Sequence, residues 1–191
     1  LVLGPELQAL AGAHVSIVGT DRAAVVDAFG HFAIEAVPPG VRDLHIEAGP
    51  EVAGGPYASL GFRLEVLEGQ ENELPGKQPV ILPRIDVGSA LPVSETVGGI
   101  LRTSELPGFE AEVLPGSVTF ANGSKAGTLY ITVVPNKRVP MPMPRGLFSN
   151  VEVAMQPAGA RFDPPLRVRM PNLEGGQPGE KFILWSLNHG T

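Results

Sequence analysis

The sequence predicts an all-β protein, arranged as two tandem β-sandwich domains. Apolar and polar residues alternate with a period of two through short runs, for example residues 14–18 and 43–47. No window of a dozen residues carries the apolar positions of an amphipathic helix without an interrupting glycine or proline. The 24 glycines and 20 prolines stand between the apolar runs, where turns are needed, and form no low-complexity block.

Residues 1–86 are expected to form the first sandwich. Its predicted strands are residues 14–18, 32–34, 43–47, 62–66 and 79–83. A turn-forming aspartate, Asp27, and a glycine, Gly30, separate the first two strands, which predicts a tight hairpin there.

Residues 108–191 are expected to form the second sandwich, with Greek-key connections. Its predicted strands are residues 109–114, 118–120, 129–134, 151–155, 166–170 and 182–187. The pair Asn122-Gly123 is a strong hairpin signal, because both residues tolerate a positive φ. Residues 87–107 show no clear alternation and are rich in Gly, Ser, Thr and Pro, so they are predicted to be a linker.

The composition excludes several classes of function. A net charge of -6, with no basic cluster longer than Lys137-Arg138, argues against nucleic-acid binding. The absence of cysteine removes disulfides, thiolate metal sites and cysteine nucleophiles. No run approaches the about 18 apolar residues of a membrane helix. The chain starts at Leu1 without a signal-peptide pattern, and we expect a piece of a longer protein.

The histidines are the first candidates for catalysis or metal binding. His45 and Glu47 lie on one strand face at the spacing of half a zinc-deaminase signature, but that signature also needs cysteines, so a solvated polar face is favoured. His14, His31 and His189 fall in separate elements without metal spacing. No nucleophile-elbow, phosphate-loop or dinucleotide motif occurs. The sequence therefore predicts neither an enzyme nor a cofactor or metal.

Two further motifs have a functional and a structural interpretation. The acidic stretch of Glu65, Glu68, Glu71 and Glu73 contains possible Ca²⁺ ligands, although a solvated loop is favoured. Asn122 begins a formal N-glycosylation sequon, but the same residues already have a turn role, which is the favoured interpretation.

The most unusual segment is residues 139–144, in which proline alternates with valine and methionine. Proline at alternate positions holds the backbone extended and without N–H donors, and the methionines offer adaptable apolar contact. The segment is either a strip that contacts a partner or a connection that crosses its own sandwich.

The first domain carries a pattern over roughly residues 1–85, which consists of residues 10–17, Thr20-Asp21, residues 27–34, residues 37–40 and residues 44–46. In this pattern it resembles the carboxypeptidase regulatory-like, or transthyretin-like, family. The order of strand, acidic turn with glycine, Phe-x-Ile, Pro-Gly and strand is that of a seven-stranded sandwich. The family is functionally diverse and largely non-enzymatic, so the resemblance implies a fold more than an activity.

The second domain carries a further set of motifs, at residues 106–109, 115–120, 127–129, 139–142, 156–165 and 170–172. In these segments it resembles, loosely, the sandwich of ankyrins and netrin receptors, and more specifically the fibronectin-like plug of bacterial Rhs and other YD-repeat, teneurin-like proteins. In those proteins a transthyretin-like domain precedes a plug that seals one end of a hollow YD-repeat shell. The resemblance implies that the remainder of a larger polypeptide is the partner. The implied contact residues are Val139, Pro140, Met141, Pro142, Met143, Phe162, Pro164 and Pro165.

The expected function is therefore a non-catalytic structural or interaction segment of a secreted or cell-surface YD-repeat protein. The alternative is a carbohydrate-binding or adhesion module of a bacterial surface protein, with a glycan or another surface protein as the partner. Sugar platforms need exposed aromatic side chains, and Tyr57, Tyr130 and Trp185 are the only Tyr and Trp residues. A hydrolase would require a serine, a histidine and a carboxylate to converge in space.

Overall fold

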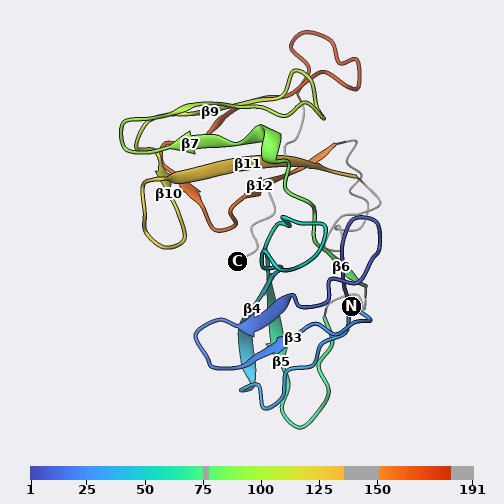
Figure 1. Cartoon of the computed structure of the whole chain (residues 1–191). Coiled ribbons are helices and arrows are strands. Elements are labelled where there is room, and N and C mark those ends of the chain that lie inside the picture. Colours follow the sequence, from blue (N-terminus) through green and yellow to red (C-terminus); the bar gives the residue numbers. More distant parts are fainter. Residues whose placement is uncertain (75–77, 136–150, 182–191) are drawn as a thin grey trace.

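The protein is all-β, as predicted. The computed structural model describes residues 1–74, 78–135 and 151–181, and these contain strands, turns and one short 3₁₀-helix but no α-helix. In Figure 1, β3, β4 and β5 lie in the lower part of the molecule, and β7 and β9 to β12 lie in the upper part. Two hydrophobic clusters correspond to these groups: the first cluster contains buried residues from Val2 to Leu82 and the second contains buried residues from Val93 to Ile131.

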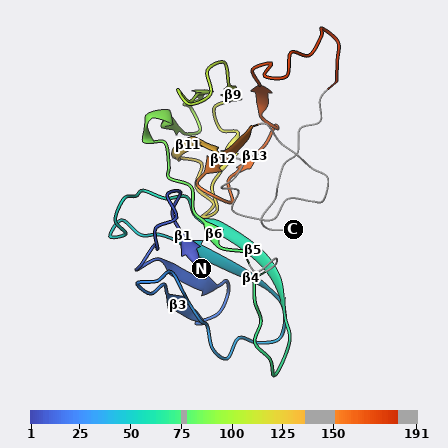
Figure 2. The ribbon, with the colours of Figure 1, turned by 90° about the vertical axis from the view of Figure 1, so that its right-hand side faces the viewer.

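The first cluster lies against a four-stranded antiparallel sheet of order β3-β2-β4-β5. The strands are β2 (His14–Ile17), β3 (Ala23–Val25), β4 (Gly40–Glu47) and β5 (Leu60–Val66). Alternation dictates the burial: Val15 and Ile46 are opposite one another in the register and both are fully buried. Figure 2 shows the short parallel pair of β1 (Val2–Leu3) and β6 (Val80–Ile81) beside this sheet.

The predicted turn after Asp27 forms, but the predicted hairpin does not. The Asp27 carboxylate accepts hydrogen bonds from the backbone N–H groups of Phe29 and His31, both at 2.8 Å, and Gly30 has a φ of 87°. The prediction of a strand at residues 32–34 is wrong. There the chain contributes side chains to the first cluster without pairing as a strand, and just before it the Gly30 carbonyl accepts a hydrogen bond from the N–H of Val2 at 2.7 Å.

The second cluster is enclosed by three small sheets of orders β12-β11-β7, β14-β9-β8 and β10-β13. The strands are β9 (Glu110–Val113), β10 (Val118–Thr119), β11 (Gly127–Val134), β12 (Glu152–Gln156), β13 (Arg161–Phe162) and β14 (Arg167–Arg169). Leu129 and Ile131 on β11 are fully buried in this cluster. The strand predicted at residues 182–187 lies outside the described residues.

Residues 87–107, which are predicted to be a linker, contain regular secondary structure. They contain η2 (Val87–Ser89), β7 (Leu91–Val93) and β8 (Gly99–Leu101). β7 pairs with β11 and β8 pairs with β9, and Val93 and Leu101 are buried in the second cluster. Each strand has only three residues and β7 contains Pro92, so neither run is long enough to show a period. The division into domains at 1–86 and 108–191 remains a prediction, but the second cluster starts before residue 108.

Asn122 and Gly123 form a turn, as predicted, although the strands on either side are not hairpin partners. Gly123 has a φ of 81° and its N–H bonds to the Phe120 carbonyl at 2.8 Å. The strand before this turn, β10, pairs with β13, whereas β11 after it pairs with β7 and β12. The turn therefore passes the chain from one sheet to another.

Candidate interaction surface

The predicted contact residues are divided between described and undescribed parts of the chain. Val139 to Met143 lie outside the described residues. Phe162 is half-buried and packs against the second cluster, and in the β10–β13 register it is opposite Val118. Pro164 and Pro165 are exposed in the corner between β13 and β14. Of the described contact residues, only these two prolines are fully available to a partner.

The strand that follows this corner leaves apolar surface uncovered. Val168 on β14 is opposite Ala111 of β9, and Ala111 is fully buried, yet Val168 is 39% exposed. Met170, just after the strand, is also exposed. Side chains directly opposite one another project from the same face of a sheet. The inward face of the sheet is therefore fully buried at β9, whereas at β14 it is partly exposed to solvent.

The outward face of the same sheet carries an ion-paired ladder. Glu110 accepts hydrogen bonds at Oε1 from Arg102 Nη2 at 2.7 Å and at Oε2 from Arg169 Nη1 at 2.9 Å. Next along the strands, Arg167 Nη1 lies 3.7 Å from Glu112 Oε2, and the Arg167 side chain is 88% exposed. Three guanidinium groups thus surround two carboxylates. Of the three, the Arg167 guanidinium has the longest distance to a carboxylate oxygen and the most exposed side chain. The sequence signal for this surface is the alternation Arg-Val-Arg beside the Pro-Pro corner.

The ladder predicts a pH dependence of stability. The hydrogen bond from Arg102 lowers the pKa of Glu110 below its ordinary value of 4.5, with a further contribution from the charge of Arg169. A lowered folded-state pKa gives stability that is present above the unfolded-state pKa and is lost as the pH falls through the folded-state value. We expect Glu110→Gln to lower the free energy of unfolding at about pH 7, and this difference from wild type to shrink below about pH 4.

This prediction is checked by urea unfolding of both proteins across that pH range. Glu68→Gln, in the exposed loop after β5, controls for the loss of one negative charge. A difference between wild type and Glu110→Gln that stays constant from neutral to acid pH would contradict the ionic role of the ladder.

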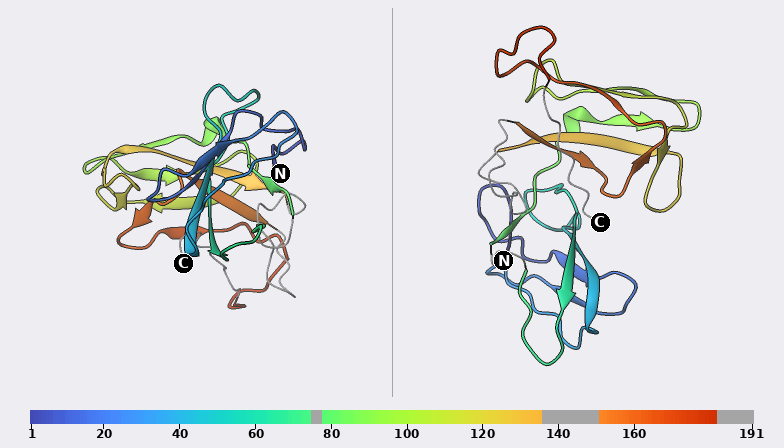
Figure 3. Two further views of the ribbon diagram at one scale, coloured as in Figure 1. Left: turned by 90° about the horizontal axis from the view of Figure 1, so that it is seen from below. Right: turned by 180° about the vertical axis from the view of Figure 1, so that it is seen from behind.

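A polar network joins η2 to β11 where the chain passes from the first cluster to the second. The N–H of Asp86 donates to Thr132 Oγ1 at 2.8 Å, and the Thr103 hydroxyl donates to Asp86 Oδ2 at 2.8 Å. Ser89 Oγ donates to the Asp86 carbonyl at 2.7 Å and accepts the N–H of Ile131 at 2.8 Å. Seen from behind in Figure 3, the green segment that leads from β6 to η2 runs between the two groups of strands. The network anchors this passage to the second cluster.

Gln156 forms a second connection between the two groups of strands. Its side chain is almost fully buried, at 5% exposure, near the end of β12. Nε2 donates to the carbonyl of Ser59 at 3.3 Å, just before β5, and Oε1 accepts the N–H of Ala158 at 3.1 Å. Residues 97 positions apart are therefore joined by one buried amide.

We expect Gln156→Ala to reduce the free energy of unfolding by about 1 kcal/mol, because the Ser59 carbonyl and the Ala158 N–H lose their partner. The distance of 3.3 Å between Gln156 Nε2 and the Ser59 carbonyl oxygen is long for a hydrogen bond, so we expect a loss of stability at the low end of the usual range. Chemical denaturation followed by circular dichroism measures the effect, with the exposed Gln177→Ala as the control. Equal stabilities of the two variants would show that the amide contributes nothing.

The described histidines, His14, His31 and His45, do not assemble a metal site, and His189 lies outside the described residues. In the described parts of the chain, no group of three or more His, Asp or Glu side chains is placed to hold a metal ion, and this covers the acidic stretch after β5. His45 Nε2 lies 3.6 Å from Glu47 Oε2, and Ser16 is opposite His45 in the register. A serine, a histidine and a carboxylate thus share the outer face of one sheet. Among the described hydrogen bonds, none joins the Ser16 hydroxyl to His45, which is the contact that activates a serine nucleophile.

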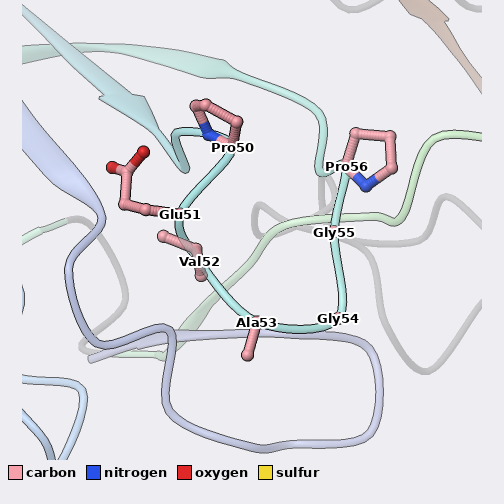
Figure 4. A pocket seen from close by; sticks show the side chains of 7 residues that line it. All are labelled: Pro50, Glu51, Val52, Ala53, Gly54, Gly55 and Pro56. Carbon is pink, nitrogen blue, oxygen red and sulfur yellow. The ribbon is translucent and has the colours of Figure 1, made fainter.

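The loop at residues 50–56 surrounds an open hollow of about 310 Å³ (Figure 4). Its lining consists of small, proline and glycine residues together with Val52 and one charged residue, Glu51. Nearby Tyr57 is buried and supports the loop, since its hydroxyl donates to the Ala53 carbonyl and accepts from Gln8 Nε2, both at 3.0 Å. Tyr57 is therefore not a sugar platform. Tyr130 is half-buried on β11, and Trp185 lies outside the described residues.

Comparisons with known proteins give no assignment. No family model, curated protein or solved structure matches this chain. Within the described residues, no helix is both long and apolar enough to cross a bilayer.

Proposed function

We propose that this chain is a non-catalytic structural and interaction segment of a larger secreted or cell-surface polypeptide. In this proposal the strands after residue 86 contact the remainder of that polypeptide, in the manner of the plug of YD-repeat shell proteins. The residues at the contact are the strip from Val139 to Met143 together with Pro164 and Pro165.

The observation that carries the proposal is the partly open face at β14. Val168 and Met170 expose apolar surface beside the Pro-Pro corner, although Val168 belongs to the face that β9 buries. Exposed apolar surface continuous with a core is typical of a surface that another part of a protein covers. Prolines supply contact area with little further loss of conformational freedom, because their φ is already restricted.

The buried connections support a structural role rather than a flexible tether. Gln156 joins β12 to the segment before β5, and the network of Asp86 anchors the passage between the two clusters. A segment held in this way presents one surface in one orientation to its partner. Such preorganisation reduces the entropic cost of binding.

The test is calorimetric titration of this chain into the separately expressed remainder of its parent polypeptide. We expect tight association that the double change Met141→Ser and Met143→Ser weakens about tenfold or more. Val41→Ser, an exposed apolar-to-polar change on β4, is the matched control and should leave the affinity unchanged.

The absence of association, with both parts folded by circular dichroism, would overturn the proposal. The glycan-binding alternative would then be tested by screening the same chain against immobilised carbohydrates.

A further inference from the structure

We propose that the edge of β14 away from β9, with which no described strand pairs, is a docking site for an extended peptide segment with carboxylates at alternate positions. The inference rests on the proposed function for its biological setting, and it adds the chemistry of the partner and the mode of recognition. The partner would add as a further strand to the sheet β14-β9-β8.

β14 is the edge of its sheet in the described part of the chain. It pairs with β9 on one side, through Arg167↔Glu112, Val168↔Ala111 and Arg169↔Glu110, and no described strand pairs with its other side. An edge strand directs backbone N–H and C=O groups of alternate residues away from its sheet. Extended peptides bind such edges through main-chain hydrogen bonds, and side-chain contacts at alternate positions give the specificity.

The side chains of β14 select for negative charge. Arg167 and Arg169 are two residues apart and so project from the same face of the sheet, with side chains 88% and 77% exposed. A strand added beside β14 would place every second side chain next to these guanidinium groups. Opposite charges at directly paired positions stabilise a sheet, and like charges destabilise it.

The chain already contains one strand of the required pattern. β9 reads Glu110-Ala111-Glu112 where it pairs with β14, so carboxylates meet the arginines and a small apolar residue meets Val168. A docking strand of alternating acidic and apolar residues would repeat this arrangement on the opposite edge. The two arginines would then lie between two rows of carboxylates, and the exposed side of Val168 would be covered.

The same arginines argue against a second copy of this chain as the occupant. Pairing β14 with β14 of another copy would bring arginine next to arginine, which is unfavourable. A short edge with charged side chains also rejects apolar strands that would aggregate there. The edge therefore discriminates by charge, through repulsion of the wrong partners as well as attraction of the right one.

The probe is a blocked peptide of about seven residues in which glutamate and valine alternate, a length typical of one strand. It is titrated into the full chain labelled with ¹⁵N, and amide shifts are followed by NMR. We expect the largest shifts at residues 166–170, and about tenfold weaker binding for the variant Arg167→Glu. Arg161→Glu, on β13 in a different sheet, is the matched control and should bind as wild type does.

Two control peptides separate this mode from others. A peptide with lysine in place of glutamate should not bind, and one with N-methylated backbone positions should bind weakly, because it cannot complete the ladder. Binding of the acidic peptide should also weaken as salt rises from about 0.05 M to about 0.5 M, because the arginines are exposed.

Shifts spread over other surfaces, or equal binding by Arg167→Glu and wild type, would overturn the inference. If the acidic peptide does not bind but the chain still binds the remainder of the parent polypeptide, only the proposed edge site is rejected. Peptide binding without association with that remainder would instead remove the proposed function and leave the edge site.

Discussion

Leu129→Ala is expected to lower the free energy of unfolding by about 3 to 5 kcal/mol. Leu129 is fully buried in the second cluster, on the central strand β11 between β7 and β12. Its truncation removes apolar contacts and leaves a cavity, and the pairing of Leu129 with Leu91 of β7 limits how far the strand can move to fill it. Denaturant unfolding measures the loss. Ile100→Ala, which truncates an exposed apolar residue on β8, is the control and should cost less than about 1 kcal/mol.

The same variant tests the predicted division into two domains. If the clusters unfold as separate domains, Leu129→Ala lowers the midpoint of one transition, and Leu10→Ala, in the first cluster, lowers the midpoint of the other. Calorimetric scans of both variants resolve the two transitions. One cooperative transition that both changes shift equally would contradict the division.

Ser89→Ala is expected to cost about 2 kcal/mol, a large effect for the loss of one hydroxyl. Ser89 is buried, and its Oγ accepts the N–H of Ile131, beyond the part of β11 that pairs with β7. The hydroxyl thus replaces a missing strand partner. Without it, a donor inside the second cluster has no acceptor, and burial of an unpaired polar group is costly.

The measurement is urea unfolding combined with hydrogen exchange at the Ile131 amide, which should exchange faster in Ser89→Ala than in wild type. Ser94→Ala is the control, because the Ser94 hydroxyl accepts the N–H groups of Thr96 and Val97 in an exposed turn where water can replace it. Unchanged protection of Ile131 would contradict this role of Ser89.

Alternation predicted the strands of four or more residues. β2, β4, β5, β9, β11 and β12 all overlap predicted ranges, because a longer strand with a buried face repeats its apolar residues at every second position. β3, β7 and β8 have three residues each, too few to show a period. Residues 32–34 show the opposite case, since they alternate and pack without pairing as a strand.

The candidate interaction surface was less predictable than the strands, because the residues that form it come from strands that are far apart in the sequence. The resemblance to the plug of YD-repeat proteins implies Pro164 and Pro165 as contact residues, and both lie exposed in the corner between β13 and β14. The partners of Arg167 and Arg169 depend on the register between β9 and β14, which no local pattern specifies. The contact between Gln156 and Ser59 likewise depends on how distant strands meet, and neither residue carries a motif.

The most direct test of an interaction role is hydrogen exchange of residues 163–170, compared between this chain alone and the intact parent polypeptide. The corner and β14 should exchange more slowly in the intact polypeptide, because the partner covers the backbone and completes the sheet. The exposed turn at Asn122 and Gly123, which has no proposed contact, should exchange equally in both. Equal exchange of residues 163–170 in the two samples would contradict the proposal that the rest of the polypeptide covers this surface.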